Sequence, residues 1–120
     1  MIDYQLGAVE SRFADIIWEN EPISSAELTR RSLEILQWKK STTYTVLKRL
    51  CDKGIFQNQG GIVTSLISRQ DLNALQSEKF VADTFDGSLP AFLAAFASRK
   101  SLSAEEVAAL RRMIDEYGEE

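Results

Sequence analysis

Residues 40–68 read KSTTYTVLKRLCDKGIFQNQGGIVTSLIS, and the hydrophobic period of this stretch changes at Gly54. Before that glycine, apolar or small residues recur every three or four positions, which predicts a helix over about 40–53. Gly54 follows as the expected C-terminal stop of this helix. The face that we expect to turn inward carries Thr43, Val46, Leu47 and Leu50.

After Gly54 the pattern is typical of a β-hairpin. β-Branched and apolar residues lie on both sides of Gly60 and Gly61, which predicts strands over 55–59 and 62–68 joined by a two-glycine turn.

Two more helices are predicted upstream. The first covers about 5–19, ends before Glu21-Pro22, and repeats apolar residues at helical spacing. The second covers about 25–36, and Ser24 and Glu27 form a capping box at its start. The inward positions that we expect are Leu6, Val9, Phe13, Ile16 and Ile17 in the first helix, and Leu28, Ile35 and Leu36 in the second.

Three short helices followed by a β-hairpin is the element order of a winged helix-turn-helix, in which the third helix is presented outward. The predicted fold is therefore mainly α with a small β-hairpin. We expect residues 1–69 to form this winged helix-turn-helix domain.

Residues 70–120 read as helical again. We expect a helix over about 69–85 capped by Ser68, a short helix begun by Ser88 and Pro90, and a last helix begun by a Ser103–Glu106 capping box. About fifty residues form a small core, so burial against a partner is favoured over self-sufficiency. We predict a helical dimerisation domain whose interface is formed by Leu89, Phe92, Leu93, Phe96, Leu110 and Ile114, with closure of a monomer core as the alternative.

Charge is divided unevenly along the chain. The formal net charge is -4, which at first argues against a nucleic-acid partner. Residues 39–53, however, carry five basic side chains and one acidic side chain, whereas residues 71–120 carry five basic and ten acidic ones. The acidity therefore belongs to the C-terminal half, and the third helix is basic.

The outward face of the third helix has the chemistry of a DNA-reading surface. Short hydroxyl side chains reach base edges, lysines bind phosphates, and the free N–H groups of a helix N-terminus attract a phosphate. We predict base reading by Ser41, Thr42 and Thr45, with Tyr44 either reading or packing, and phosphate binding by Lys39, Lys40, Lys48 and Lys53. Arg49 either joins the DNA-binding set or forms an ion pair within the domain.

Composition excludes most enzyme chemistry. The chain has no histidine and one cysteine, so the commonest general base, a disulfide framework and cysteine-cluster metal sites are missing. No nucleophile motif or phosphate-binding loop is present, and we predict neither a catalytic residue, nor a metal, nor a cofactor. The N-terminal residues 1–5 do not read as a secretory signal, no stretch reads as a membrane span, and we expect a cytoplasmic protein.

The run from Trp38 to Gly54 resembles the recognition-helix segment of the penicillinase-repressor family of transcriptional regulators. The matching residues there are Trp38, Thr42, Thr45, Leu47, Arg49, Leu50, Lys53 and Gly54. Glu10 with Ile17-Trp18 resembles the family's first helix, and residues 87–96 with 102–106 resemble its dimerisation part. The resemblance covers nearly the whole chain and implies a dimeric winged-helix repressor that binds an inverted-repeat operator in double-stranded DNA.

The resemblance also implies a route of inactivation. In the antibiotic-responsive members a membrane sensor-protease triggers proteolysis before a Phe that matches Phe96, which points to the bond between Ala95 and Phe96. Ala95 stands where those members have Asn, so the residue before the expected cut differs from theirs. Lys39-Lys40-Ser41 replaces their Ser-Pro-Lys at the start of the recognition helix, so a different operator sequence is expected.

An alternative function remains open from the residues alone. The acidic total and a modest hairpin are also compatible with a winged-helix protein-interaction module without sequence-specific DNA binding.

Overall fold

The structure is a computed structural model that describes residues 4–118. Residues 1–3, part of the segment tested above for a secretory signal, and residues 119–120 lie outside the described part. The chain divides into two compact units, Met1–Glu78 and Lys79–Glu120.

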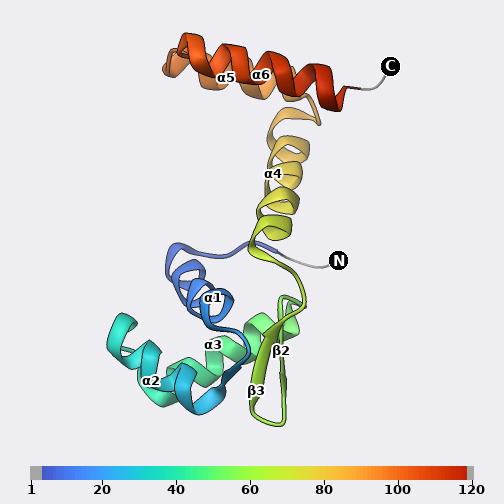
Figure 1. Cartoon of the computed structure of the whole chain (residues 1–120). Coiled ribbons are helices and arrows are strands. Elements are labelled where there is room, and N and C mark those ends of the chain that lie inside the picture. The colour runs from blue at the N-terminus through green and yellow to red at the C-terminus, as the bar shows by residue number, and fades with distance from the viewer. Residues whose placement is uncertain (1–3, 119–120) are drawn as a thin grey trace. The chain divides into compact units, whose positions relative to one another are not determined.

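Unit 1 is a winged helix-turn-helix, as the element order predicts (Figure 1). Its elements in chain order are α1 (Ala8–Asn20), β1 (Ile23–Ser24), α2 (Ser25–Leu36), α3 (Lys40–Asp52), β2 (Phe56–Gln59), β3 (Ile62–Ser65) and the first half of α4 (Arg69–Phe85).

The core of unit 1 lies between the three helices and the hairpin. Phe13 and Ile17 of α1, Leu28 of α2, and Leu50 of α3 are fully buried, and so are Phe56 and Val63 of the hairpin. Trp18 and Trp38 are partly buried at the rim, where Trp38 stacks on Phe13 with 5.1 Å between ring centroids. This core fixes the outward surface of α3.

The hairpin has the predicted turn and an additional strand. Gln59 pairs with Ile62 across the two glycines, whose φ angles of 61° and 84° lie in the left-handed region that glycine adopts without strain. β1 pairs with β3, with Ile23 opposite Val63, so the sheet has the order β1-β3-β2. A two-residue strand shows no periodicity of its own, so the sequence did not predict it. β3 ends at Ser65, earlier than predicted, where the Ser65 N–H donates to Glu21 Oε1 at 2.8 Å.

Three details of the first two helices correct the predictions. α1 begins at Ala8 rather than near residue 5, and the Gly7 N–H donates to Glu10 Oε1 at its start. Val9 of α1 and Ile35 of α2, both expected to turn inward, are 49% and 45% exposed, whereas Leu36 packs against the core. Only half of the expected capping box of α2 is present: Ser24 Oγ accepts from the Glu27 N–H, but the carboxylate of Glu27 binds Arg30 and Arg31 instead.

The first half of α4 belongs to unit 1. Ser68 Oγ accepts from the Asp71 N–H as predicted, Leu72 is buried in the core of unit 1, and Gln76 Nε2 donates to the Tyr4 carbonyl at 2.7 Å. The boundary between the compact units therefore lies after Glu78, nine residues beyond the boundary expected from the sequence.

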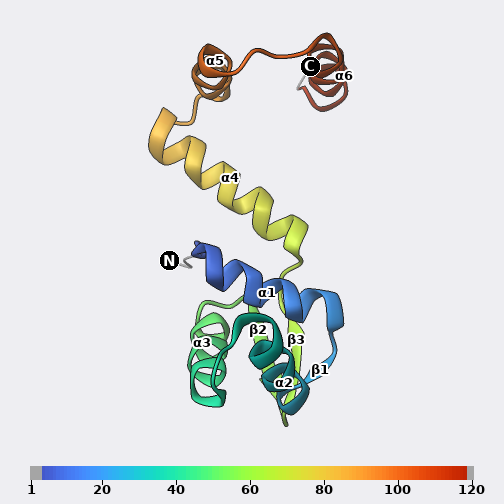
Figure 2. The same ribbon diagram turned by 90° about the vertical axis from the view of Figure 1, so that its left-hand side faces the viewer.

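Unit 2 contains the second half of α4, then α5 (Leu89–Arg99) and α6 (Ala104–Tyr117), which Figure 2 shows end on. Ser88 caps α5 through the Ala91 N–H, and Ser103 and Glu106 form the predicted capping box of α6. No residue of α5 or of α6 is buried within the described chain. The phenylalanines Phe80, Phe85, Phe92 and Phe96 form a chain of ring contacts with centroids 5.7 to 6.3 Å apart.

Candidate nucleic-acid interface

Helix α3 has one buried face and one exposed face. Thr43, Val46, Leu47 and Leu50 are buried, as predicted. Five side chains predicted to contact DNA lie on the exposed face of the same helix: the proposed base readers Ser41, Thr42, Tyr44 and Thr45, and the proposed phosphate contact Lys48. The residues predicted to bind DNA are thus presented together to solvent, which is the arrangement that entering a major groove requires.

The N-terminus of α3 is open. Lys39 is its N-cap residue, and no side chain caps the helix, so the first-turn N–H groups remain available. Lys39 and Lys40 are both exposed at this end, and the ammonium of Lys40 lies 5.9 Å from the centre of the Tyr44 ring. Free N–H groups, the helix dipole and two ammonium groups together favour a phosphate at this position.

Further along the exposed face, side chains are partly occupied by local contacts. Thr45 Oγ1 donates to the Ser41 carbonyl at 2.9 Å, which fixes its rotamer while its two lone pairs stay available. Lys48 Nζ donates to Asp52 Oδ2 at 3.3 Å, and both side chains are mostly exposed. Such an exposed pair contributes little to stability and exchanges readily for a phosphate.

The C-terminal end of α3 is hydrogen-bonded to the N-terminal segment of the domain. Arg49 Nη1 donates to Glu10 Oε2 at 3.1 Å, and Lys53 Nζ donates to the Gln5 carbonyl at 2.8 Å. Arg49 therefore forms an ion pair within the domain, one of the two roles considered for it. Glu10, 39 residues away in sequence, has no local signal that would have indicated this role.

The carboxylate of Glu10 is held in its charged form. Burial alone would raise its pKa, but the Gly7 N–H, the hydrogen bond from Arg49 and the charges of Lys53 and Arg49 outweigh burial and lower the pKa.

The other cations of unit 1 are mostly neutralised. Arg30 and Arg31 bind Glu27, and Arg30 also binds Glu34 at 2.7 Å. Among the described residues of unit 1, the basic side chains that contact neither a carboxylate nor a carbonyl are Arg12, Lys39 and Lys40. Two of these three flank the open N-terminus of α3, so the available positive charge is concentrated there.

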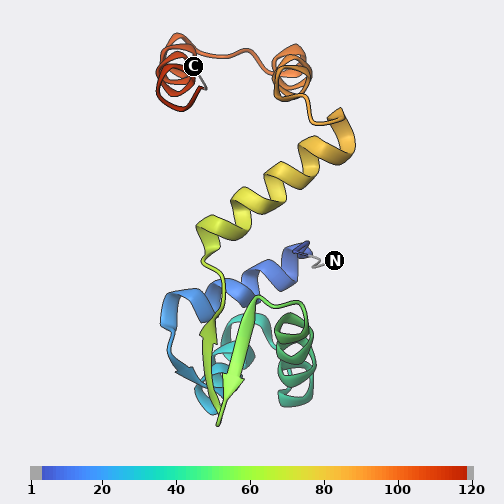
Figure 3. The same cartoon turned by 90° about the vertical axis from the view of Figure 1, so that its right-hand side faces the viewer.

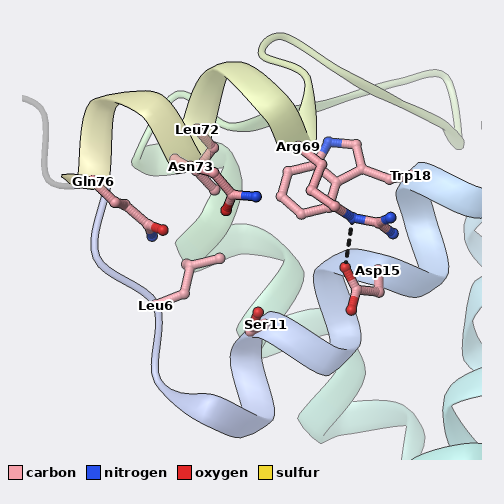
Figure 4. A pocket seen from close by; sticks show the side chains of 8 residues that line it. All are labelled: Leu6, Ser11, Asp15, Trp18, Arg69, Leu72, Asn73 and Gln76. Carbon is pink, nitrogen blue, oxygen red and sulfur yellow. Dashed lines mark ion pairs between the residues drawn. The ribbon is translucent and has the colours of Figure 1, made fainter. Parts of the chain in front are cut away.

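A polar recess of about 230 Å³ lies between α1 and the first turns of α4 (Figure 4). Arg69 crosses it: its Nε lies 2.9 Å from Asp15 Oδ1, and its guanidinium carbon lies 5.6 Å from the centre of the Trp18 ring. Glu19 lies 3.5 Å from the same guanidinium group. These contacts attach α4 to α1, and the recess is lined by side chains of unit 1 that lie outside α3.

The described residues contain no group of three or more His, Cys, Asp or Glu side chains placed to hold a metal ion. Cys51 is partly buried on α3, and burial, with the charge of Asp52, raises the pKa of its thiol, which favours the unreactive form. Within residues 4–118, no helix is long and apolar enough to cross a membrane.

Comparison with known proteins decides the family. The sequence profile described as "Penicillinase repressor" matches residues 6–116. This chain belongs to the penicillinase repressor family. Members of the family are DNA-binding transcriptional repressors and not enzymes. This confirms two predictions from the sequence, that the protein is a DNA-binding repressor and that it is not an enzyme.

Two relatives illustrate how far the family similarity extends. The chain is 24% identical to the "Penicillinase repressor" of Bacillus licheniformis over 117 residues, covering 94% of this chain and 91% of the relative. It is 22% identical to the "Methicillin resistance regulatory protein MecI" of Mammaliicoccus sciuri over 116 residues, covering 93% and 94%. The match to the penicillinase repressor family thus spans both compact units.

Proposed function

We propose that this repressor binds an inverted-repeat operator in double-stranded DNA as a homodimer, with α3 of each protomer in a major groove. The observation that carries the proposal is the open N-terminus of α3, where Lys39 and Lys40 supply cations without a carboxylate partner. A phosphate bound there would fix the helix while its exposed hydroxyl groups face the base edges.

The roles of the side chains follow from their positions along α3. Ser41 and Thr42 lie in the first turn and Thr45 one turn later, so these three hydroxyl groups are the proposed base readers, with Tyr44 beside them. Lys39, Lys40 and Lys48 are the proposed phosphate contacts. Arg49 and Lys53 hold the C-terminal end of the recognition helix in place by donating to Glu10 and to the Gln5 carbonyl.

A second copy of the chain would supply the affinity that one domain lacks. Few cations per protomer give weak, salt-sensitive binding, and two linked domains gain through effective concentration and through the match to a two-fold operator. The proposed interface residues Leu89, Phe96 and Ile114 are 55%, 46% and 64% exposed in the single chain. Phe92, Leu93 and Leu110, together with Phe96, line an apolar groove of about 300 Å³. A dimer would cover these surfaces.

Relief of repression by proteolysis is a further part of the proposal. The Ala95–Phe96 bond lies inside α5, and a protease requires this segment in an extended form. Because α5 has no buried residue in the single chain, local unfolding costs little once the dimer opens. The proposed partner is a membrane sensor-protease, and the proposed location of the repressor is the cytoplasm.

Selection of bound duplexes from a random pool, at low and moderate salt, tests the proposal. Enrichment of a palindrome supports a dimeric reader. In that case Lys40→Glu should weaken binding to all sequences, whereas Thr42→Ala should mainly reduce sequence preference. No enrichment at either salt concentration would instead favour the protein-interaction module.

A further inference from the structure

The connection between β3 and α4 is short and hydrogen-bonded. Residues 66–68 join the two elements beside α1 (Figure 3), and they include neither glycine nor proline. The Leu66 N–H donates to the Ile55 carbonyl at 2.8 Å. The Trp18 Nε1–H on α1 donates to the Ile67 carbonyl at 3.0 Å. The connection is therefore fixed to two other parts of unit 1.

The first residue of α4 binds the same helix, α1. The Arg69 guanidinium group pairs with Asp15 at 2.9 Å and lies against the Trp18 ring (Figure 4). Glu19 pairs with the same guanidinium group at 3.5 Å. Trp18 thus contacts the connection with its N–H group and the start of α4 with its ring. We call these contacts of Trp18 and Arg69 the α1–α4 anchor.

α4 links unit 1 to the residues proposed for the dimer interface. The helix runs from Arg69 to Phe85, across the boundary after Glu78, and the proposed interface residues all follow it in the chain. It contains neither glycine nor proline, at which helices most often kink. α1 and α3 share the core of unit 1, so any movement of the recognition helix relative to the start of α4 must change the α1–α4 anchor.

The separation of two half-sites in an operator fixes where the two recognition helices must lie. One additional base pair moves a half-site by about 3.4 Å along the duplex and turns it by about 35° around the axis. A dimer with both anchors intact therefore fits one separation. On any other separation it must break an anchor or release one half-site, and both reduce the affinity.

We propose that Trp18 and Arg69 are positioning residues that determine which separation of half-sites the dimer accepts; this rests on the proposed function. Neither residue lies on α3, so their effect is on the separation and not on base reading. The side chains of Asp15 and Glu19 are 44% and 65% exposed, so the ion pairs are weak enough to break on a misspaced duplex.

The test uses the full chain and the half-sites selected by the wild type, with one base pair added or removed between them. Fluorescence anisotropy gives the affinity for the selected separation, for each altered separation and for a single half-site. In the double variant Trp18→Phe with Arg69→Ala, the preference for the selected separation should fall about tenfold, because a misspaced duplex no longer has to break the anchor. The affinity for a single half-site should equal that of the wild type.

A single substitution avoids any change in the core, against which Trp18 packs. Arg69→Ala removes a side chain that is 44% exposed, and the preference for the selected separation should fall about threefold. Arg12→Ala is the matched control, because it removes the same charge from the exposed surface of α1. This control should keep the wild-type preference.

The possible outcomes separate the anchor from the proposed function. A wild-type preference in both anchor variants would overturn the role of Trp18 and Arg69. Equal losses of affinity at every separation and at the single half-site would also overturn it, since the two residues would then only stabilise unit 1. A wild type that selects no palindrome would overturn the proposed function, and this inference with it.

Discussion

Arg49 in the last turn of α3 donates to Glu10 in the first turn of α1, with 3.1 Å between Nη1 and Oε2. The Glu10 side chain is only 20% exposed, and its other oxygen accepts the Gly7 N–H. The carboxylate of Glu10 thus accepts a hydrogen bond at the N-terminus of α1 and also pairs with Arg49 in the last turn of the recognition helix. The pair places Arg49 in a supporting role, and this leads to a prediction about stability and pH.

Glu10→Gln should lower the free energy of unfolding by about 1 kcal/mol at neutral pH, as expected for a partly buried ion pair with a helix-capping bond. Because the folded pKa of Glu10 is lowered, its contribution is complete above the ordinary pKa of a glutamate and disappears as the pH falls through the lowered value. Urea unfolding of the wild type and of Glu10→Gln across the acid range should therefore give free energies of unfolding that converge as the pH falls.

Glu34→Gln is the matched control for this measurement. Its carboxylate is 60% exposed and pairs with Arg30 on the same helix, so the expected loss is at most about 0.5 kcal/mol. An equal loss in both variants, or a constant gap for Glu10→Gln at every pH, would contradict the assigned role of Glu10.

Lys40→Ala should reduce the salt dependence of operator binding. Each lysine that neutralises a phosphate contributes about 0.9 to the slope of log affinity against log salt, so a dimer lacking both copies should lose about 1.8. Arg12→Ala is the control, because Arg12 is exposed on α1 and also lacks a carboxylate partner among the described residues. Fluorescence anisotropy over a salt series measures both slopes, and equal losses would show that overall charge, rather than the start of α3, sets the binding.

The features that could be predicted from the sequence are local. Ser68, Ser88 and Ser103 cap helices at the predicted positions. These caps were predictable because a serine directly before a helical pattern can accept a hydrogen bond from a first-turn backbone N–H. Gly60 and Gly61 fixed the turn in the same way, since both need a positive φ.

The features that could not be predicted depend on contacts between distant segments. The pairing of β1 with β3 needs a partner 40 residues away, at Val63 opposite Ile23. The tie between Arg49 and Glu10 likewise spans 39 residues. Ile35 lies at helical spacing from Leu28 and was expected inside, but it is 45% exposed, which the period of α2 alone does not reveal. The exposed face of α3 was predictable because the amphipathic period of one helix defines it. The net charge available on that face was not predictable, because it depends on which basic side chains form ion pairs with carboxylates.

A fragment of residues 1–78 should fold cooperatively and be more stable than a fragment of residues 1–69. The shorter fragment lacks Leu72, which is 2% exposed, and Gln76, whose side chain binds the Tyr4 carbonyl. Burial of one leucine contributes about 2 kcal/mol, so the difference in unfolding free energy should be at least that large. Urea titration of both fragments measures it.

A point variant separates the effect of the core contact from that of fragment length. In the intact chain, Leu72→Ala should cost about 2 to 4 kcal/mol, whereas Leu75→Ala, at a position that is 36% exposed, should cost clearly less. Similar costs for the two variants would contradict the assignment of the first half of α4 to unit 1.

Ile114→Asp should convert the proposed dimer to monomer without unfolding unit 1. Ile114 is 64% exposed in the single chain and follows Val107 and Leu110 along one stripe of α6, so the carboxylate would be buried only where a second copy covers it. Burial of an unpaired charge costs several kcal/mol, enough to dissociate a dimer at micromolar concentration. Ala108→Asp, with the same change of charge on another face of α6, should leave the dimer intact. Sedimentation equilibrium measures both; a dimer that survives Ile114→Asp would place the interface elsewhere.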